Sequence, residues 1–545
     1  MTGADLIANI LQQWGVPFIA TLCGHGLDPI DAACRRVGLR LVDVRNEQAA
    51  GYMADACGRL TGEVGVCASS SGVAHVNALT GAVNAFFDGA PLLLITGSGP
   101  THTIGRGHFQ DLDHAAIARP ICKYVAVVDR AERIPEQLHN AWTAAISGRP
   151  GPVQLTVPLD VLNAEVDAAV FSGPVNRPKR PMASGDPQAI RAAVDALMAA
   201  RRPVLIAGSG IHYSHGEAAL LRLAKTQAIP ILTPIWDRGA ISKPTEVFLG
   251  VVGAATGGPE ILQDADCVVM VGAAADYRLG YLQPPVITAG ACIIRIDADL
   301  LQLQQGLAEQ LRLAGDPALI LNQLSEALET AGREPSTPWL TEAQKRRDTF
   351  RVQGVAMKTT TGSELHALDL INAVKTILTD ETILIVDGGN IGQWVHQTMT
   401  NRYPGHWLTC GASGVVGYGL PAAMTARLLY PDRPIILITG DGAFTFTIAE
   451  LESAARQKLG FAVVLADDEA WGITLTGHIR QFGHGITSEL GPIAFDQVAS
   501  GFGAEGIRVR SADELPSLIK RASVGDRPVV IHIPIVRSNP SERTR

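Results

Sequence analysis

The chain has 545 residues, of which 47% are hydrophobic and 18% are charged, and its formal net charge is −8. This length predicts about three or four domains, and a negative charge without a basic block argues against a nucleic-acid partner. No apolar stretch approaches the ~20 residues of a membrane span, which argues against a membrane protein. The eight cysteines form no CxxC pair, so free thiols in a reducing cytoplasm are expected.

Residues 1–15 predict a first helix, because apolar side chains recur there at helical spacing without the regions of a signal peptide. After this segment, strand-like apolar runs alternate with helical patterns through the whole chain. Runs that are apolar on both faces and separated by helices indicate parallel sheets covered on both sides. Such runs lie at 64–69, 91–97, 203–208, 267–272, 292–297, 383–388 and 461–466.

Two stretches interrupt this alternation. Residues 171–187 are rich in Pro, Gly and Ser, and residues 333–362 are polar and charged, so both are expected to be linkers. The predicted fold is therefore α/β, with three doubly wound parallel-sheet domains at 1–170, 188–332 and 360–540. The outer two blocks share the order strand, small-residue loop, helix and buried strand, which predicts two related domains around a different central one.

Acidic residues follow two strand-like runs of the last block. Asp441 lies in a Gly-Asp-Gly turn, and Asp467 and Asp468 directly follow the run at 461–466. Because open parallel sheets bind ligands outside the carboxyl ends of their strands, the two loops are expected to meet. A helix expected at 445–456 would offer N–H groups to an anion. Two carboxylates and a backbone carbonyl suit Mg²⁺ bridging to a diphosphate; the alternative is two unrelated, solvated loops.

This spacing resembles the diphosphate-binding motif of the thiamine-diphosphate-dependent enzyme family, which includes acetolactate synthases and benzaldehyde lyase. The resemblance implies a pyrimidine-binding, a central Rossmann-like and a diphosphate-binding domain, in that order. It also implies that Asp441, Asp468 and the backbone carbonyl of Ala470 bind Mg²⁺. The family motif usually ends in Asn-Asn, whereas this chain has Asp467 and Asp468. The extra carboxylate would add negative charge beside an anionic cofactor.

Other segments resemble family motifs in the same order along the chain. VRNEQAAGY at 44–52 resembles the segment whose glutamate, here Glu47, contacts N1′ of the aminopyrimidine. HFQDLDH at 108–114 resembles the segment that carries an active-site glutamine, here Gln110. In the last block, IVDGGNIGQW, GVVGYGLPAA, TGDGAF and ADDEAWG resemble cofactor-binding loops. The cofactor-binding residues implied there are Asn390, Val416, Gly440, Asp441, Gly442, Ala443, Asp468, Ala470 and Trp471.

The family resemblance also implies a mechanism and an assembly. Glu47 would share a proton with N1′, and Val416 would hold the cofactor bent, so that C–C bonds next to a carbonyl can break or form. In the family, the pyrimidine and diphosphate sides of one site come from different subunits. A homodimer is therefore the expected minimum, and a homotetramer is common among relatives.

The resemblance limits the substrate to small carbonyl compounds. The run ADDEAWGITL at 466–475 is similar to benzaldehyde lyase and favours a 2-hydroxyketone lyase or carboligase. The alternatives are an acetolactate synthase-like enzyme, a 2-oxoacid decarboxylase, a cyclic 1,2-diketone hydrolase and a non-catalytic cofactor-binding regulatory subunit.

Proton transfer at neutral pH suits histidine. His25 lies one place before the usual catalytic histidine of benzaldehyde lyase and is the first candidate, with His75 in a neighbouring loop as the second. In the central block, PVLIAGSGI at 203–211 resembles an element that holds FAD in acetolactate synthases. Many relatives keep this domain empty, so FAD is the less favoured expectation.

Overall fold

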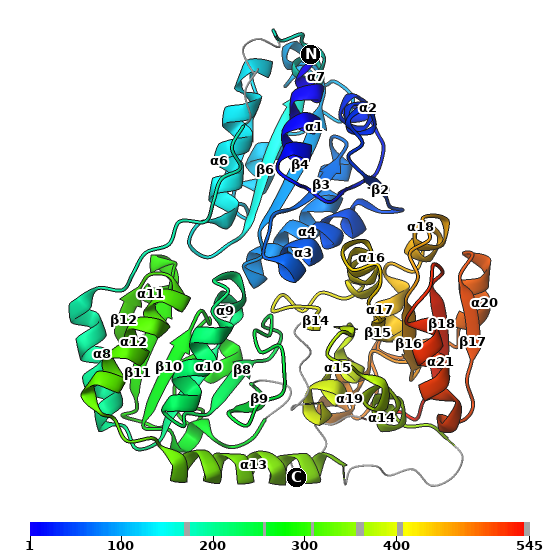
Figure 1. Cartoon of the computed structure of the whole chain (residues 1–545). Helices are drawn as coiled ribbons and strands as arrows, with labels where there is room; N and C mark the ends of the chain where they lie inside the picture. The colour runs from blue at the N-terminus through cyan, green and yellow to red at the C-terminus, as the bar shows by residue number, and fades with distance from the viewer. Residues whose placement is uncertain (168–174, 254–257, 307–309, 356–363, 400–406, 539–545) are drawn as a thin grey trace.

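The computed structural model describes residues 1–167, 175–253, 258–306, 310–355, 364–399 and 407–538. These residues form three α/β domains, each built around a six-stranded sheet with helices on its faces (Figure 1). The predicted fold class is confirmed, while the exact domain boundaries stay predictions. None of the helices in the described ranges is long and apolar enough to cross a membrane.

The N-terminal domain, at the top of Figure 1, has strand order β2-β1-β3-β4-β6-β5 with parallel neighbours. Strands β3 and β4 are buried along their whole length, as expected for runs that are apolar on both faces. The strands are β1 (Ile19–Thr21), β2 (Leu41–Asp43), β3 (Gly65–Ser69), β4 (Leu92–Ser98), β5 (Tyr124–Val127) and β6 (Pro152–Pro158). The helices are α1 (Gly3–Gln13), α2 (Asp28–Val37), α3 (Glu47–Thr61), α4 (Val73–Asp88), α5 (His114–Ala118), α6 (Ile134–Ile146) and α7 (Leu159–Asn163).

The C-terminal domain has strand order β14-β13-β15-β16-β18-β17, which repeats the order of the N-terminal sheet position by position. The predicted likeness of the two outer blocks is therefore confirmed. The strands are β13 (Ile383–Val386), β14 (Trp407–Thr409), β15 (Ile435–Gly440), β16 (Ala462–Asp467), β17 (Glu505–Arg508) and β18 (Val529–Pro534). The helices are α14 (Ala367–Ile377), α15 (Gly389–Thr398), α16 (Gly419–Leu429), α17 (Asp441–Thr445), α18 (Glu450–Arg456), α19 (Gly472–Phe482), α20 (Phe495–Gly501) and α21 (Leu515–Ala522).

The central domain differs, as the sequence predicts: its order is β12-β11-β10-β7-β8-β9, that of the doubly wound dinucleotide-binding folds. The strands are β7 (Pro203–Ala207), β8 (Ile231–Pro234), β9 (Phe248–Val252), β10 (Cys267–Val271), β11 (Cys292–Asp297) and β12 (Leu311–Ala314). The helices are α8 (Pro187–Ala199), α9 (Ser209–Tyr213), α10 (Glu217–Thr226), α11 (Leu300–Gln304), α12 (Pro317–Ala331) and α13 (Thr337–Val355).

The expected second linker is in part a helix. Residues 337–355 form α13, which runs along the bottom of Figure 1 from the central domain towards the C-terminal domain. Trp339 and Ala343, one turn apart, are buried in the core of the central domain, and Trp339 Nε1 donates to the carbonyl of Pro203 at 3.0 Å. The composition of this segment predicted a linker because the helix has few apolar residues that pack on the core and many charged ones. In the first linker, residues 175–186 have no regular secondary structure.

Helix α3 joins the two outer domains. It packs against α4 in its own domain and against α16 in the C-terminal domain. A Cβ on Gly81 of α4 would lie 2.2 Å from the carbonyl carbon of Gly51, so the close approach of α3 and α4 requires glycine there. On the other side, the rings of Tyr52 and Tyr418 meet edge to face at 5.7 Å within a core that both domains share.

A buried ion cluster holds all three domains together. Arg59 of α3 is fully buried, and its Nη1 donates to the carbonyl of Thr409 in the C-terminal domain at 2.9 Å. From the central domain, Arg238 Nε donates to the carbonyl of Arg59, also at 2.9 Å. Asp55 and Asp88 lie 3.7 and 3.4 Å from Arg59 Nη1. Burial raises the pKa of Asp55 to about 7, although Arg59 opposes this.

Candidate cofactor site

A cavity of about 270 Å³ lies at the carboxyl ends of β13, β15 and β16 in the C-terminal domain. In this strand order, the gap between β13 and β15 is the switch point at which open parallel sheets bind ligands. The cavity is lined by every residue that the family resemblance assigns to the cofactor in this domain, namely Asn390, Val416, Gly440, Asp441, Gly442, Ala443, Asp468, Ala470 and Trp471.

Asp441 is the first residue of α17 and is almost fully buried at the cavity. The backbone N–H of Ala470 donates to its Oδ2 at 3.2 Å, which joins the loops after β15 and β16. Burial, helped by the charge of Asp468, raises the pKa of Asp441 to about 7. The predicted helix at 445–456 is confirmed only in its second half: α18 spans Glu450–Arg456, and the shorter α17 already starts at Asp441 and ends at Thr445.

Asp468 follows β16 directly and points into the cavity, where Asn390 Nδ2 donates to its Oδ2 at 3.0 Å. Burial raises its pKa, and Asn390 and Arg537 counteract part of this effect. Its neighbour Asp467 points away, because successive strand residues face opposite sides of a sheet. Asp467 does not line the cavity and instead meets His532 of β18. The structure thus brings Asp441 and Asp468 together and separates Asp467 from both.

The loop after β16 is held in place from several sides. Arg537 donates to the carbonyls of Asp468 and Glu469, both at 2.9 Å. The ring of Trp471 lies over Gly442, where an added Cβ would come within 2.8 Å of the ring. Any side chain at position 442 would therefore displace Trp471 from the cavity wall. The role of Arg537, which follows the last strand of the domain, was not predicted from the sequence.

These residues fit a divalent cation and a diphosphate. Burial and the charge of Asp468 raise the pKa of Asp441, and no positive side chain among the described residues lines the cavity. A bound cation would relieve this repulsion. Asn390 Oδ1 is buried without a hydrogen-bond partner among the described residues. No group of three or more His, Cys, Asp or Glu side chains in the described ranges could hold a metal alone. A cation here would depend on the Ala470 carbonyl and on oxygens of the ligand.

Glu47 does not line this cavity. It is the first residue of α3, half-buried, and its Oε2 accepts from Asn77 Nδ2 of α4 at 3.0 Å. The loop before it is held by the C-terminal domain, where the buried Glu450 accepts from the N–H of Arg45 at 2.9 Å. Within one chain, Glu47 therefore does not share a cavity with Asp441 and Asp468.

The predicted histidines of the N-terminal domain differ in their surroundings. His25 is half-buried after β1 and stacks on His108 at 5.2 Å, and its Nε2 has no hydrogen-bond partner among the described residues. His75 is fully buried in α4, and its Nδ1 lies 2.9 Å from the hydroxyl of Thr96. Burial, helped by His114, lowers the pKa of His75 to about 3. His75 is therefore a neutral core residue, which corrects its placement in an open loop.

Gln110 lies beside these histidines. Its Oε1 accepts from the Ser71 hydroxyl at 2.8 Å, and the N–H of Gly72 donates to His114 Nε2 at 2.8 Å. The segment after β4 thus folds back over the loop after β3 and covers this edge of the N-terminal sheet.

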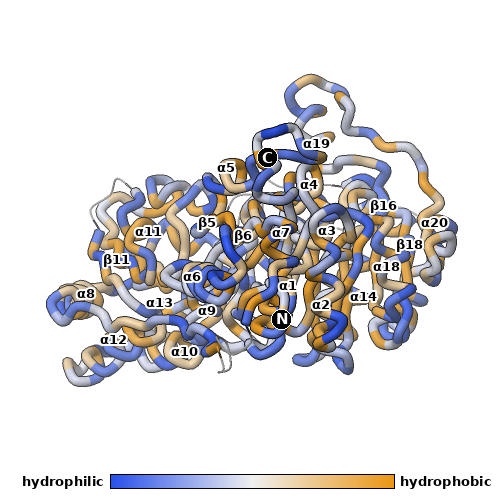
Figure 2. Tube along the Cα trace, turned by 90° about the horizontal axis from the view of Figure 1, so that it is seen from above, coloured by the Kyte–Doolittle hydropathy of each residue, from blue (hydrophilic) through white to orange (hydrophobic). Residues whose placement is uncertain are grey.

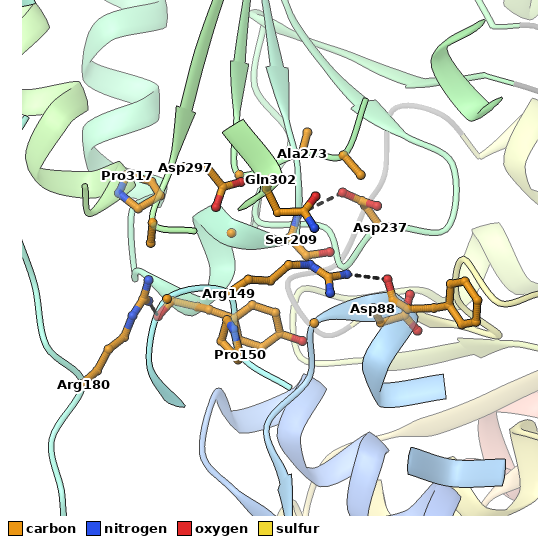
Figure 3. Close-up of a pocket in the computed structure, with 18 of the residues that line it drawn as sticks. Asp88, Arg149, Pro150, Arg180, Ser209, Asp237, Ala273, Asp297, Gln302 and Pro317 are labelled. Carbon is orange, nitrogen blue, oxygen red and sulfur yellow. Dashed lines mark hydrogen bonds between the residues drawn. The ribbon is translucent and has the colours of Figure 1, made fainter. Parts of the chain in front are cut away.

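The central domain has a second pocket, at the switch point between β7 and β10 (Figure 3). It is narrow, at about 40 Å³, and far below the ~300–1,000 Å³ of typical cofactor sites. Arg149 reaches across it and donates to the carbonyls of Phe86 and Phe87 at 2.7 and 2.5 Å. Asp237 accepts a hydrogen bond from the backbone N–H of Ser209 at 3.0 Å. In this conformation the pocket is narrowed by its own side chains.

Comparison with known proteins assigns the same three parts. Residues 1–117, 190–324 and 387–533 match the N-terminal thiamine pyrophosphate-binding domain, the central domain and the C-terminal thiamine pyrophosphate-binding domain of thiamine pyrophosphate enzymes.

Full-length relatives agree with this match. The acetolactate synthase isozyme 1 large subunit of Escherichia coli is 30% identical, over 98% of this chain and 94% of that protein. The 2-hydroxyacyl-CoA lyase 2 of Bos taurus is 29% identical, over 98% and 90%. A probable acetolactate synthase large subunit of Methanocaldococcus jannaschii is 28% identical, over 98% and 92%. With its three parallel sheets and its acidic cavity, this chain is an enzyme of the thiamine pyrophosphate family.

Proposed function

We propose that this protein uses thiamine diphosphate and Mg²⁺ to cleave or join C–C bonds next to a carbonyl group. The observation that carries the proposal is the meeting of Asp441, Asp468 and Ala470 at one cavity, at the switch point of the C-terminal sheet. The two carboxylates and the Ala470 carbonyl would hold Mg²⁺, and the metal would hold the diphosphate. When bound, the cofactor supplies an electron sink for bonds next to a carbonyl.

We propose further that the active unit is a dimer, in which Glu47 of one chain serves the cavity of the other. Glu47 lies beside α4, whose exposed face carries Val73 and Val76 next to its partner Asn77. Helix α19, which carries the exposed Ile479 and Phe482, lies on the same side of the molecule as α4 (Figure 2). An exposed apolar surface of this kind suits contact with a second copy.

In the reaction, Glu47 would hold a proton at the aminopyrimidine, and His25 would move a proton at the substrate. His25 suits this role because it is only half-buried, whereas His75 is fully buried and its Nδ1 is engaged by Thr96. A half-buried imidazole can accept and return a proton near neutral pH.

The direction of the reaction has two candidates that the relatives support equally. One relative is named a 2-hydroxyacyl-CoA lyase and the other an acetolactate synthase. A lyase or carboligase of 2-hydroxyketone type, similar to benzaldehyde lyase, agrees with the histidine after β1. An acetolactate synthase-like enzyme is the second candidate, and it would not need His25.

The test begins with protein freed of cofactor by EDTA dialysis. Thiamine diphosphate and Mg²⁺ are added separately and together, and tryptophan fluorescence is followed, because Trp471 lines the cavity. Turnover is then screened with 2-oxoacids, acyloins, 2-hydroxyacyl-CoA thioesters and cyclic 1,2-diketones, with product identification. Failure to bind thiamine diphosphate with Mg²⁺ would overturn the proposal. Binding without turnover would favour a regulatory subunit.

A further inference from the structure

Asp467 adds a second carboxylate directly beside a proposed metal ligand. Its side chain is 7% exposed, so its charge is only weakly screened by water. An uncompensated charge at this point would repel the diphosphate of the cofactor. The chain must therefore offset the charge of Asp467 or turn it away.

His532 of β18 holds Asp467 turned away. Its Nε2 lies 2.8 Å from Asp467 Oδ2, and the ring is fully buried. In the β16–β18 ladder, Asp467 is opposite Pro534 and Leu465 is opposite His532. Positions two apart share a face, so Asp467 and His532 are diagonal neighbours on one face of the sheet. That face points away from the cavity, whereas Asp468 points into the cavity.

The other ring nitrogen of His532 also faces a carboxylate. Nδ1 lies 3.3 Å from Oδ1 of Asp496 on α20, and the ring of Phe495 packs edge-on at 5.4 Å. Each ring nitrogen of His532 thus contacts a carboxylate, so both ends of its ring are fixed.

We propose that His532 is a positioning residue that holds Asp467 turned away from the metal, so that only Asp441 and Asp468 face the cofactor. The proposal rests on the cofactor site proposed above. It gives a physical account of how Asp-Asp can stand where the family motif usually has Asn-Asn. A purely structural pair, which only holds α20 on the sheet, is the competing explanation.

The two explanations predict different effects of a His532 substitution on the affinity for the anionic cofactor and on the affinity for the metal. If the charge of Asp467 is released, an anion is repelled, whereas a cation bound alone is not. His532→Gln should therefore weaken thiamine diphosphate at saturating Mg²⁺ by at least about tenfold, the low end for residues around metal ligands. Mn²⁺ alone, titrated by EPR at pH 8, should bind as in wild type or more tightly. Loss of a structural contact would weaken both ligands together.

Asp467→Asn in the His532→Gln background removes the released charge and should restore cofactor affinity to near wild type. Asp467→Asn alone should bind the cofactor as well as wild type or better, and it keeps the test valid if His532→Gln does not fold. Phe495→Leu is the matched control, because it loses packing against the ring but keeps both carboxylates.

Wild-type affinity in folded His532→Gln would overturn this inference, as would equal weakening of both ligands without rescue. A tenfold weaker cofactor in Asp467→Asn alone would also overturn it. If the wild-type protein itself binds no thiamine diphosphate, the proposed cofactor site fails first. The two failures are therefore distinguishable.

Discussion

The N-terminal and C-terminal sheets have the same strand order but opposite chemistry at the same place. After β13, β15 and β16, the C-terminal sheet presents carboxylates, glycines and a cavity of about 270 Å³. After β1, β3 and β4, the N-terminal sheet presents His25, Ser71 and a segment whose Gln110 and His108 cover the edge. The topology sets where a site can form, and the loop residues decide what it can do.

This difference assigns the two sheets separate tasks. The C-terminal edge would bind the metal and diphosphate, and the N-terminal edge of the partner subunit would carry out proton transfer. The tasks can therefore be separated experimentally, because a change at one edge should leave the measured property of the other intact.

The largest effect is expected at the N-terminal edge. Glu47→Gln should keep the fold and cofactor binding but lower turnover by about 10²–10⁴-fold, the usual share of general acid–base groups. Exchange of the cofactor C2 proton, followed by NMR, measures the step directly. Exchange at the wild-type rate would remove Glu47 from this role and end the division of tasks.

At the C-terminal edge, Asp468→Ala should weaken Mg²⁺ and thiamine diphosphate together by about 10–100-fold. The reason is that Asp468 faces the cavity, and its carboxylate would connect the metal to the protein. Fluorescence titration of each ligand measures the effect. Asp467→Asn is the control and should be mild. If Asp467 proves the costlier position, the assignment of ligands is shifted by one residue.

His25→Ala should lower kcat by at least about tenfold while leaving cofactor affinity nearly intact. Steady-state kinetics on the best substrate of the screen, with a cofactor titration, measure both quantities. His102→Ala, at an exposed histidine of the same domain, is the control. Normal turnover by His25→Ala would favour the acetolactate synthase-like alternative.

The smallest effect concerns the stability of the N-terminal edge. Burial lowers the pKa of His75 to about 3, against about 6.5 in an unfolded chain. Between these values only the unfolded state binds the proton, so the free energy of unfolding falls as pH drops below about 6.5. From pH 7.5 to 5.5, His75 should account for about 1.4 kcal/mol of this loss.

Urea unfolding at both pH values, on wild type and His75→Gln without cofactor, measures this contribution as a difference of differences. Asp441 acts in the opposite sense: its raised pKa of about 7 makes it lower the stability of the cofactor-free protein as pH rises from about 4 to 7. An equal acid-side loss in wild type and variant would show that His75 is not buried in its neutral form.

The sequence by itself determined the three sheets and the cofactor residues of the C-terminal domain. Runs that are apolar on both faces can be stable only as covered strands, and the loops at their carboxyl ends contain Asp441 and Asp468 within a few residues of the strand. These features are local. Asn390, Val416 and Trp471 were assigned by motif, and they line the cavity because each motif follows a strand or begins a helix of the same sheet.

Only the tertiary structure decided which residues of these motifs face one another. His25 and His75 look alike in sequence, yet His25 is half-buried and stacks on His108, whereas His75 is fully buried with its Nδ1 against Thr96. The pairing of Asp467 with His532 spans 65 residues, and the contact of Glu450 with the loop before Glu47 spans more than 400. The direction of a side chain depends on the face of its strand or helix and on what covers that face. Contacts between distant segments decide both, and no local pattern records them.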